Sequence, residues 1–181
     1  MYTIINMIGV PDCCALIYLT KTNLINLLVK LFDEVWIGEG VYHECVARGK
    51  EERKNDAFIL ERLIEESTNF KIKKISSRKE FEKERVYLIG PGETDVYLMA
   101  KADDKAVVVT SDNSAYKKLV RRGAKVVRAD ELLLLAFKRK IFNFDEFCDN
   151  LTKLKVVGGT TEERIAFLIK KALNIERWKQ K

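Results

Sequence analysis

The chain has 181 residues, the usual size of a single domain, and is long enough to bury a core without disulfides or a structural metal. Hydrophobic residues make up 47% of it and charged residues 33%, and no apolar stretch reaches membrane-spanning length, which argues against a membrane partner. The net charge of +6 favours an anionic partner without identifying one.

The first half of the chain alternates short apolar runs with amphipathic segments. The apolar runs predict strands at residues 3–10, 34–37 and 70–75. The segments with apolar residues at helical spacing predict helices at residues 13–19, 23–32, 41–54 and 57–66. Apolar residues alternate with lysine at residues 70–75, which is typical of a strand near the edge of a sheet.

The second half begins with a charged stretch, up to Lys83, that predicts a helix with a solvated face. The Gly-Pro-Gly turn at residues 90–92 leads into the next helix, and Gly123 separates a helix from a short strand. Strands are predicted at residues 105–110 and 125–127. Helices are predicted at residues 93–102, 114–122, 131–139, 145–154 and 161–173.

This alternation predicts an α/β fold in which helices cover both faces of a parallel central sheet. Two helices follow the last strand, and we expect them to be additions to the sheet domain. The chain is therefore divided into a sheet domain at residues 1–142 and a C-terminal helical extension at residues 143–181, packed on the same domain.

Four acidic residues stand where a predicted strand turns into a helix, or just inside the next helix: Asp12, Glu44, Asp95 and Asp112. The C-terminal ends of parallel strands share one edge of the sheet, so distant residues converge there. Converging carboxylates repel one another unless a cation neutralises them, and hard oxygen ligands select Mg²⁺ or Mn²⁺. Taken singly, each acid also has an ordinary explanation, as a helix cap, a partner of a helix dipole or a solvated residue.

Other chemistries lack their motifs. The turn at residues 90–92 has neither the spacing nor the lysine of a P-loop, and no GxGxxG follows the first strand. His43 is the only histidine, and no GxSxG is present, which disfavours the usual hydrolase triads. Cys13, Cys14, His43 and Cys45 do not have zinc-site spacing. Without a CxxC pair or a secretory signal, the cysteines predict a cytoplasmic protein with reduced thiols.

Five segments of the chain are weak motifs individually but informative as an ordered set. They are PDCCALI at residues 11–17, GVYHEC at 40–45, GETDVYLMA at 92–100, VVVTSDN at 107–113 and RGAKVV at 122–127. Together they resemble the PIN-domain nucleases from about residue 2 to residue 143. The chain looks closest to a prokaryotic subgroup with a Gly-Glu-x-Glu/Asp helix start and an extra C-terminal helical region. The resemblance implies a three-layer α/β/α PIN-like domain with a central parallel sheet.

The resemblance also implies a metal site. Asp12, Glu44, Asp95 and Asp112 would be its acids, and Glu93 would be an auxiliary acid or a competitor with Asp95 for the same role. One or two Mg²⁺ or Mn²⁺ ions would bind the scissile phosphate and activate a water, which Asp112 or Glu44 could orient. Cleavage would leave a 5′-phosphate and a 3′-hydroxyl.

Two positions depart from the pattern of the family. Cys13 and Cys14 stand where Thr or Ser is frequent, and a thiol hydrogen-bonds a ligand shell more weakly than a hydroxyl does. Asn113 stands where many members carry another acid. Both departures bear on the level of activity and leave the four acids intact.

The leading expectation is a metal-dependent ribonuclease, as the toxin of a toxin–antitoxin pair. Its expected partners are RNA and an antitoxin protein. A basic cluster close to Asp112 is expected to contact the RNA backbone, with salt-dependent affinity, and consists of Lys117, Lys118, Arg121 and Arg122. One alternative is a catalytically weak RNA-binding or RNA-processing assembly protein. Another is a structural partner whose acids only cap helices.

A homodimer is also expected, because the last helices carry more apolar residues than peripheral helices normally need. These residues are Leu132 to Leu135, Phe137, Ile165, Phe167, Leu168 and Ile169. A dimer would lengthen the basic surface around two acidic clefts.

Overall fold

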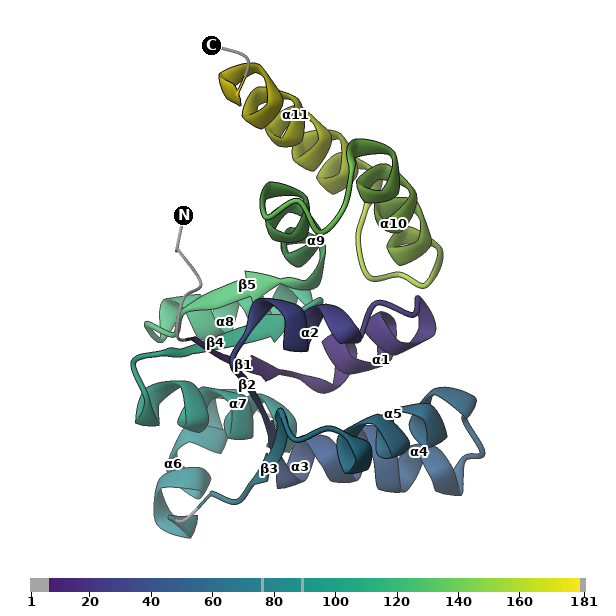
Figure 1. Cartoon of the computed structure of the whole chain (residues 1–181). Coiled ribbons are helices and arrows are strands. Elements are labelled where there is room, and N and C mark those ends of the chain that lie inside the picture. The colour runs from purple at the N-terminus through teal and green to yellow at the C-terminus, as the bar shows by residue number, and fades with distance from the viewer. Residues whose placement is uncertain (1–6, 76, 89, 180–181) are drawn as a thin grey trace.

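The computed structural model describes residues 7–75, 77–88 and 90–179, and its centre is a parallel sheet of five strands (Figure 1). The strand order is β3-β2-β1-β4-β5. The strands are β1 (Ile8–Pro11), β2 (Glu34–Gly38), β3 (Phe70–Lys73), β4 (Ala106–Thr110) and β5 (Val126–Arg128). The expected three-layer α/β/α fold is confirmed, and β3 lies at an edge of the sheet as its sequence predicted.

Helices cover the sheet on both sides, with α6 and α7 on one side and α1 and α2 on the other (Figure 1). From the N-terminus they are α1 (Cys13–Lys21), α2 (Asn26–Leu31), α3 (Glu39–Tyr42), η1 (His43–Ala47), α4 (Arg48–Glu51), α5 (Asn55–Glu66) and α6 (Arg78–Leu88). They continue with α7 (Pro91–Ala102), α8 (Asn113–Arg121), α9 (Ala129–Lys138), α10 (Phe144–Val156) and α11 (Glu162–Lys179). Within the described residues, no helix has the length and apolarity needed to cross a bilayer.

The central strands β1 and β4 are buried along their whole length, because helices cover both of their faces. β1 pairs with β4 from Ile8 opposite Ala106 to Pro11 opposite Val109. On its other side β1 pairs with β2. Since all pairings are parallel, the C-terminal ends of these three strands face the same edge of the sheet. This is the edge where the acidic residues were expected to meet.

Most predicted elements differ from the structure by a few residues at their ends, and two of them bear on the site. The described part of the first strand begins at Ile8, and residues 3–6 of the prediction lie outside the described residues. The helix predicted at residues 41–54 begins earlier, at Glu39, and contains a turn of π-helix, η1. Such single turns occur mostly as insertions in α-helices and often at functional sites. Here the π turn carries Glu44.

The C-terminal helices pack on α9, with Leu151 and Leu154 of α10 and Leu168 of α11 fully buried. A buried carboxylate also joins α11 to α9. Arg164 of α11 donates from Nε to Asp130 Oδ2 at 2.9 Å and from Nη2 to Oδ1 at 2.6 Å. Both charges therefore sit in the two-point geometry that makes an arginine–carboxylate pair strong.

Most of the residues on which the homodimer expectation rests belong to the core of one chain. Leu132, Leu133 and Leu134 are at most 2% exposed, and Leu168 is fully buried. Of the apolar residues that carried this expectation, only Phe167 is exposed, with 46% of its surface accessible. The apolar surplus seen in the sequence is thus largely used to pack α9, α10 and α11 together.

The Asp130–Arg164 pair gives a stability prediction. Asp130→Asn removes the nearer of the two carboxylates that Arg164 faces, and we expect the free energy of unfolding to fall by about 2 kcal/mol, since Arg164 keeps Glu131 at 3.2 Å and can partly regain water. Urea unfolding of Asp130→Asn and of the exposed control Asp149→Asn measures the effect. A change within about 0.5 kcal/mol is expected for the control, and an equally small change for Asp130→Asn would contradict the role of the pair.

Candidate metal site

An acidic pocket of about 180 Å³ lies at the C-terminal edge of the sheet. Four carboxylates from separate parts of the chain line it: Asp12 after β1, Glu44 of η1, Glu93 of α7 and Asp112 after β4. Its other lining residues are Cys13, Cys14, Gly90, Gly92 and Ala115. The structure therefore brings Asp12, Glu44 and Asp112 together at one place, and it adds Glu93.

Asp12 and Asp112 are both helix caps. Asp12 Oδ1 accepts from the backbone N–H of Ala15 at 2.7 Å, and Asp112 Oδ1 accepts from that of Ala115 at 2.6 Å. The capping explanation for these two acids is therefore correct, but it accounts for only one carboxylate oxygen of each. The N-terminal ends of α1 and α8, which carry the positive ends of the helix dipoles, also border the pocket and favour negative charge in it.

Glu44 and Glu93 reach the pocket from two neighbouring helical segments. Gly92 makes this possible, because a Cβ there would lie 3.2 Å from Glu44 Oε2. Glu93 is paired with Lys118 of α8, whose Nζ lies 3.1 Å from Oε2 and 3.4 Å from Oε1. One of the four carboxylates is thus neutralised by a cation of the chain itself.

Asp95 departs from the expected convergence. It is not among the residues that line the acidic pocket, and its Oδ2 accepts the backbone N–H of Gly40 at 2.6 Å. A Cβ at Gly38 or Gly40 would lie 2.6 or 2.5 Å from Asp95 side-chain atoms, so the two glycines let Asp95 approach the backbone closely. Burial raises the pKa of Asp95, and the N–H groups of Gly40 and Val41 oppose this rise.

The helix geometry of α7 explains the difference. Each residue of an α-helix is rotated by about 100° around the helix axis relative to the one before it. Residues two positions apart therefore differ by about 200° and point to nearly opposite sides of the helix. Glu93 and Asp95 both lie inside α7, which begins at Pro91, and therefore face opposite sides. Once Glu93 lines the pocket, Asp95 is directed away from it. Of the two options that the sequence left open at this helix, the structure brings Glu93 to the other acids.

The pocket is electrostatically unfavourable for the Asp12 carboxylate. Burial first, and then the negative charges of Asp112 and Glu93, raise the pKa of Asp12 to about 6 despite hydrogen bonds from Thr110 and Ala15. The same kind of environment raises the pKa of the Cys14 thiol to about 12, through burial first and then the nearby carboxylates. A bound cation would relieve both effects.

The thiols at the family's usual hydroxyl positions border this pocket. Cys13 and Cys14 line it, and the pKa of Cys13 is raised mainly by a hydrogen bond with Cys45 and by burial. Both thiols are therefore protonated at neutral pH and are poor metal ligands in this state. In the described part of the chain, no group of three or more His, Cys, Asp or Glu side chains is arranged to hold a metal ion directly.

The donor set nevertheless fits Mg²⁺ or Mn²⁺. These ions favour carboxylate oxygens and water over sulfur, and Mg²⁺ usually keeps several waters while binding one or two carboxylates and a substrate phosphate. A pocket with one oxygen each on Asp12 and Asp112 that does not cap a helix, and with Glu44 and Glu93 at its sides, offers that kind of site. A direct cage of three or four protein ligands is not needed for it.

The four basic residues expected to contact RNA have different surroundings. Lys117 and Arg121 are exposed on α8, whereas Lys118 pairs with Glu93. Arg122 pairs with the buried Glu84 and lies 4.8 and 5.1 Å from the rings of Tyr87 and Tyr97. Arg122 therefore joins α8 to α6 and α7 and is not a free surface cation.

Comparison with known proteins agrees with this architecture. A family model described as a PIN domain, DUF3368, matches residues 8–170. The match covers the acidic pocket and most of the C-terminal helices. No curated protein matches the chain significantly.

Proposed function

The chain belongs to the PIN-domain family, whose members are generally nucleases, and from this premise we propose that it is a metal-dependent ribonuclease. The reaction is hydrolysis of an RNA phosphodiester bond. The observation that carries the proposal is the acidic pocket, where Asp12, Glu44, Glu93 and Asp112 meet at the C-terminal ends of parallel strands. Carboxylates gathered in this way bind a cation more readily than any other ligand.

Mg²⁺ or Mn²⁺, when bound, supplies a Lewis acid for the scissile phosphate and lowers the pKa of a water. The residues that would hold it are Asp12 and Asp112, through the oxygens that do not cap helices, together with Glu93. Glu44 is exposed and lines the pocket, and it would orient the attacking water. The N-terminal ends of α1 and α8 favour the phosphate as a second anion.

Lys118 would have a double role in this site. Without metal and RNA, it holds Glu93 by an ion pair. When a cation neutralises Glu93, the ammonium group is released to face the phosphate backbone. The wider RNA contact would come from Lys117 and Arg121, which are exposed on the same helix.

The surroundings of the basic residues predict different effects of their removal. Replacing Lys117 and Arg121 together by Ala should weaken RNA binding and lower the slope of log affinity against log salt by about 1.4, since each single-strand phosphate contact contributes about 0.7. Arg122→Ala should instead lower thermal stability, because the buried Glu84 loses its nearer partner and keeps only Lys101, at 4.0 Å. RNA binding titrations between low and moderate salt, and thermal unfolding, measure both. An unchanged slope in the double variant would place the RNA elsewhere.

A toxin role is the biological setting that we propose for the activity. The chain would then act on cellular RNA and be held inactive by a bound antitoxin protein, and it would act as a homodimer. Expression of the wild type and of Asp12→Asn, with and without the protein encoded by the adjacent reading frame, tests this setting. Growth arrest by the wild type alone, relieved by the neighbour, is the expected result; equal growth of both strains would contradict it.

The second candidate is an RNA-binding protein of the same fold with little catalysis. The Lys118–Glu93 ion pair favours it, because a built-in cation lowers the affinity of the pocket for a metal. A cleavage assay separates the two. Purified protein is incubated with single-stranded and structured RNA in EDTA, Mg²⁺ or Mn²⁺, and the product ends are identified. Metal-dependent products with 5′-phosphate ends support the ribonuclease, whereas binding without cleavage supports the second candidate.

A further inference from the structure

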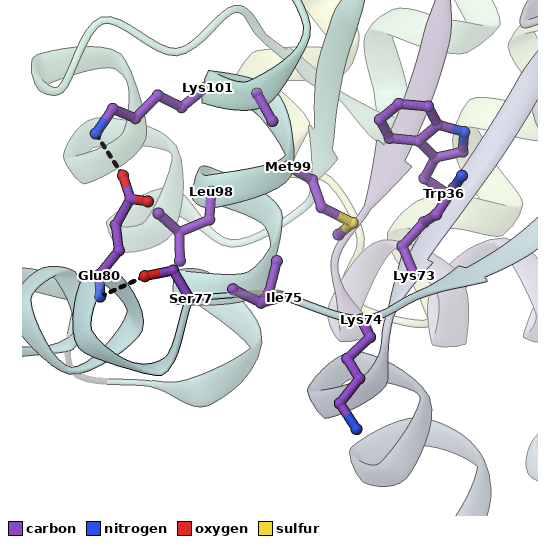
Figure 2. A pocket seen from close by; sticks show the side chains of 10 residues that line it. Trp36, Lys73, Lys74, Ile75, Ser77, Glu80, Leu98, Met99 and Lys101 are labelled. Carbon is purple, nitrogen blue, oxygen red and sulfur yellow. Dashed lines mark hydrogen bonds and ion pairs between the residues drawn. The ribbon is translucent and has the colours of Figure 1, made fainter.

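A second pocket, of about 360 Å³, lies between the sheet edge and helices α6 and α7 (Figure 2). Its apolar part is formed by Trp36, Ile75, Leu98, Met99 and Ala102, and its polar part by Lys73, Lys74, Ser77, Glu80 and Lys101. None of the four acids of the acidic pocket lines it. Helix α7 connects the two places, because its first turn borders the acidic pocket and its last turns border this one.

We propose that this second pocket binds a nucleotide of single-stranded RNA, with the base stacked on Trp36 and the phosphate at Lys73. The inference rests on the proposed ribonuclease function. It adds a binding subsite for the strand whose scissile bond lies in the acidic pocket. A base on an aromatic ring and a phosphate on a lysine are the two contacts from which single-strand binding is usually built.

Trp36 offers a ligand the face of its ring, which in this structure lies under the Lys73 ammonium group, 4.6 Å from the ring centre. Its indole Nε1–H donates to Glu34 Oε2 at 2.7 Å, so the polar end of the side chain is already used. The contact that remains is with the π face. Stacking on such a face tolerates any base, and the subsite therefore binds RNA without selecting its sequence.

The charges around the pocket favour an anion. Lys73 Nζ lies 4.6 Å from the centre of the Trp36 ring, and among the described residues it forms no ion pair (Figure 2). Lys74 has only a distant carboxylate partner, Glu39, at 3.9 Å. Lys101 is neutralised by Glu80 at 2.8 Å. The Lys73 ammonium group lies over the ring and has no carboxylate partner among the described residues, so a stacking base would displace it toward the phosphate of the same nucleotide.

The two pockets are close enough to be served by one strand. Ala102 follows Glu93 by nine positions, which corresponds to about 14 Å along the axis of α7 and about 180° around it, so the strand has to pass around the helix. A strand of several nucleotides can cover this distance, but a dinucleotide in the acidic pocket cannot also occupy the second pocket. The contribution of Trp36 should therefore appear only with longer RNA.

The test uses the full chain with Asp12→Asn, so that RNA is bound but not cut. Binding of a labelled single-stranded oligonucleotide and of a dinucleotide is measured by fluorescence anisotropy. We expect Trp36→Leu to weaken binding of the longer RNA about tenfold and to leave dinucleotide binding unchanged. Trp36→Phe, which keeps an aromatic face, should retain most of the affinity. Lys73→Ala should lower the salt slope by about 0.7, whereas the exposed control Lys170→Ala should not.

Several outcomes would overturn the subsite. One is equal binding of the longer RNA by Trp36→Leu and the parent, together with an unchanged slope in Lys73→Ala, when both variants unfold at the same temperature as the parent. A second is adenosine monophosphate competing as well as the oligonucleotide, which would indicate a free-nucleotide site. A third is Trp36-dependent binding of an acidic peptide in place of RNA.

Failure of the subsite and failure of the ribonuclease proposal are distinguishable. In the Asp12 wild type, Trp36→Leu should raise KM for the longer RNA and leave kcat unchanged. Cleavage by Trp36→Leu with an unchanged KM would contradict the subsite and leave the ribonuclease proposal intact. Trp36-dependent binding of RNA without any metal-dependent cleavage would support the subsite and contradict the ribonuclease proposal.

Discussion

Asp12→Asn is expected to abolish metal-dependent cleavage and, at the same time, to make the metal-free protein more stable. The substitution keeps the shape of the side chain and an oxygen that can cap α1 through Ala15. It removes one negative charge from the metal site, where we expect a loss of cleavage of at least about 100-fold. A helix cap without a metal role would leave cleavage unchanged, whereas the gain in stability follows from burial of the carboxylate in either case.

The gain in stability has a defined pH dependence. The pKa of Asp12 is raised from 3.8 to about 6 in the folded chain, so folding favours the protonated carboxyl. The stability that this group contributes is present below about pH 4 and is lost as pH rises through 6. Asn stays neutral, and the variant should exceed the wild type by up to about 3 kcal/mol above pH 6. The difference should vanish near pH 4.

Thermal unfolding at a series of pH values, with and without Mn²⁺, measures this prediction. Added Mn²⁺ should raise the Tm of the wild type, because a ligand that binds only the folded state stabilises it, and should have little effect on Asp12→Asn. If the wild type is more stable than the variant at pH 8 without metal, the Asp12 carboxylate is not destabilised by burial and its acidic neighbours, and the prediction is wrong.

Glu93→Gln and Asp95→Ala are expected to have opposite consequences, although the residues are two positions apart. Glu93→Gln removes a carboxylate from the acidic pocket and should reduce cleavage by at least about tenfold with little loss of stability. Asp95→Ala leaves the Gly40 N–H without its acceptor and should lower the free energy of unfolding by about 1–3 kcal/mol. Cleavage at a temperature well below Tm should persist in this variant.

Cleavage rates and urea unfolding of both variants decide between the two acids. Glu66→Gln, exposed on α5 and paired with Arg62, is a matched control for loss of a surface carboxylate. Loss of cleavage in Asp95→Ala at unchanged stability would indicate that Asp95 belongs to the metal site. Retained cleavage with lower stability would indicate that Asp95 supports the turn at Gly38 and Gly40.

The sheet and the edge where the acids meet could be predicted from the sequence for a simple reason. Strands such as β4 are short apolar runs, and Asp12 and Asp112 follow β1 and β4 closely, so parallel pairing alone places them together. Helix rotation was the missing step for Glu93 and Asp95. The start of α7 at Pro91 fixes which of them faces the pocket, and a boundary error of one residue changes the answer.

Other features of the site depend on contacts that no local pattern contains. The π turn that carries Glu44 has no signal in the apolar spacing of residues 41–54. The burial of Glu84, which engages Arg122, depends on how α6 packs against α8. The apolar residues of α9 and α11 could belong to a core or to a dimer interface, and sequence periodicity does not distinguish these two uses of an apolar face.

Cleavage of one labelled single-stranded RNA by wild type and Asp12→Asn, purified in parallel and incubated with EDTA, Mg²⁺ or Mn²⁺, tests the central claim most directly. The account predicts products with 5′-phosphate ends from the wild type, only with a divalent metal, and none from Asp12→Asn although it binds the RNA. Equal cleavage by both proteins, or cleavage by the wild type in EDTA, would contradict a metal-dependent site in the acidic pocket.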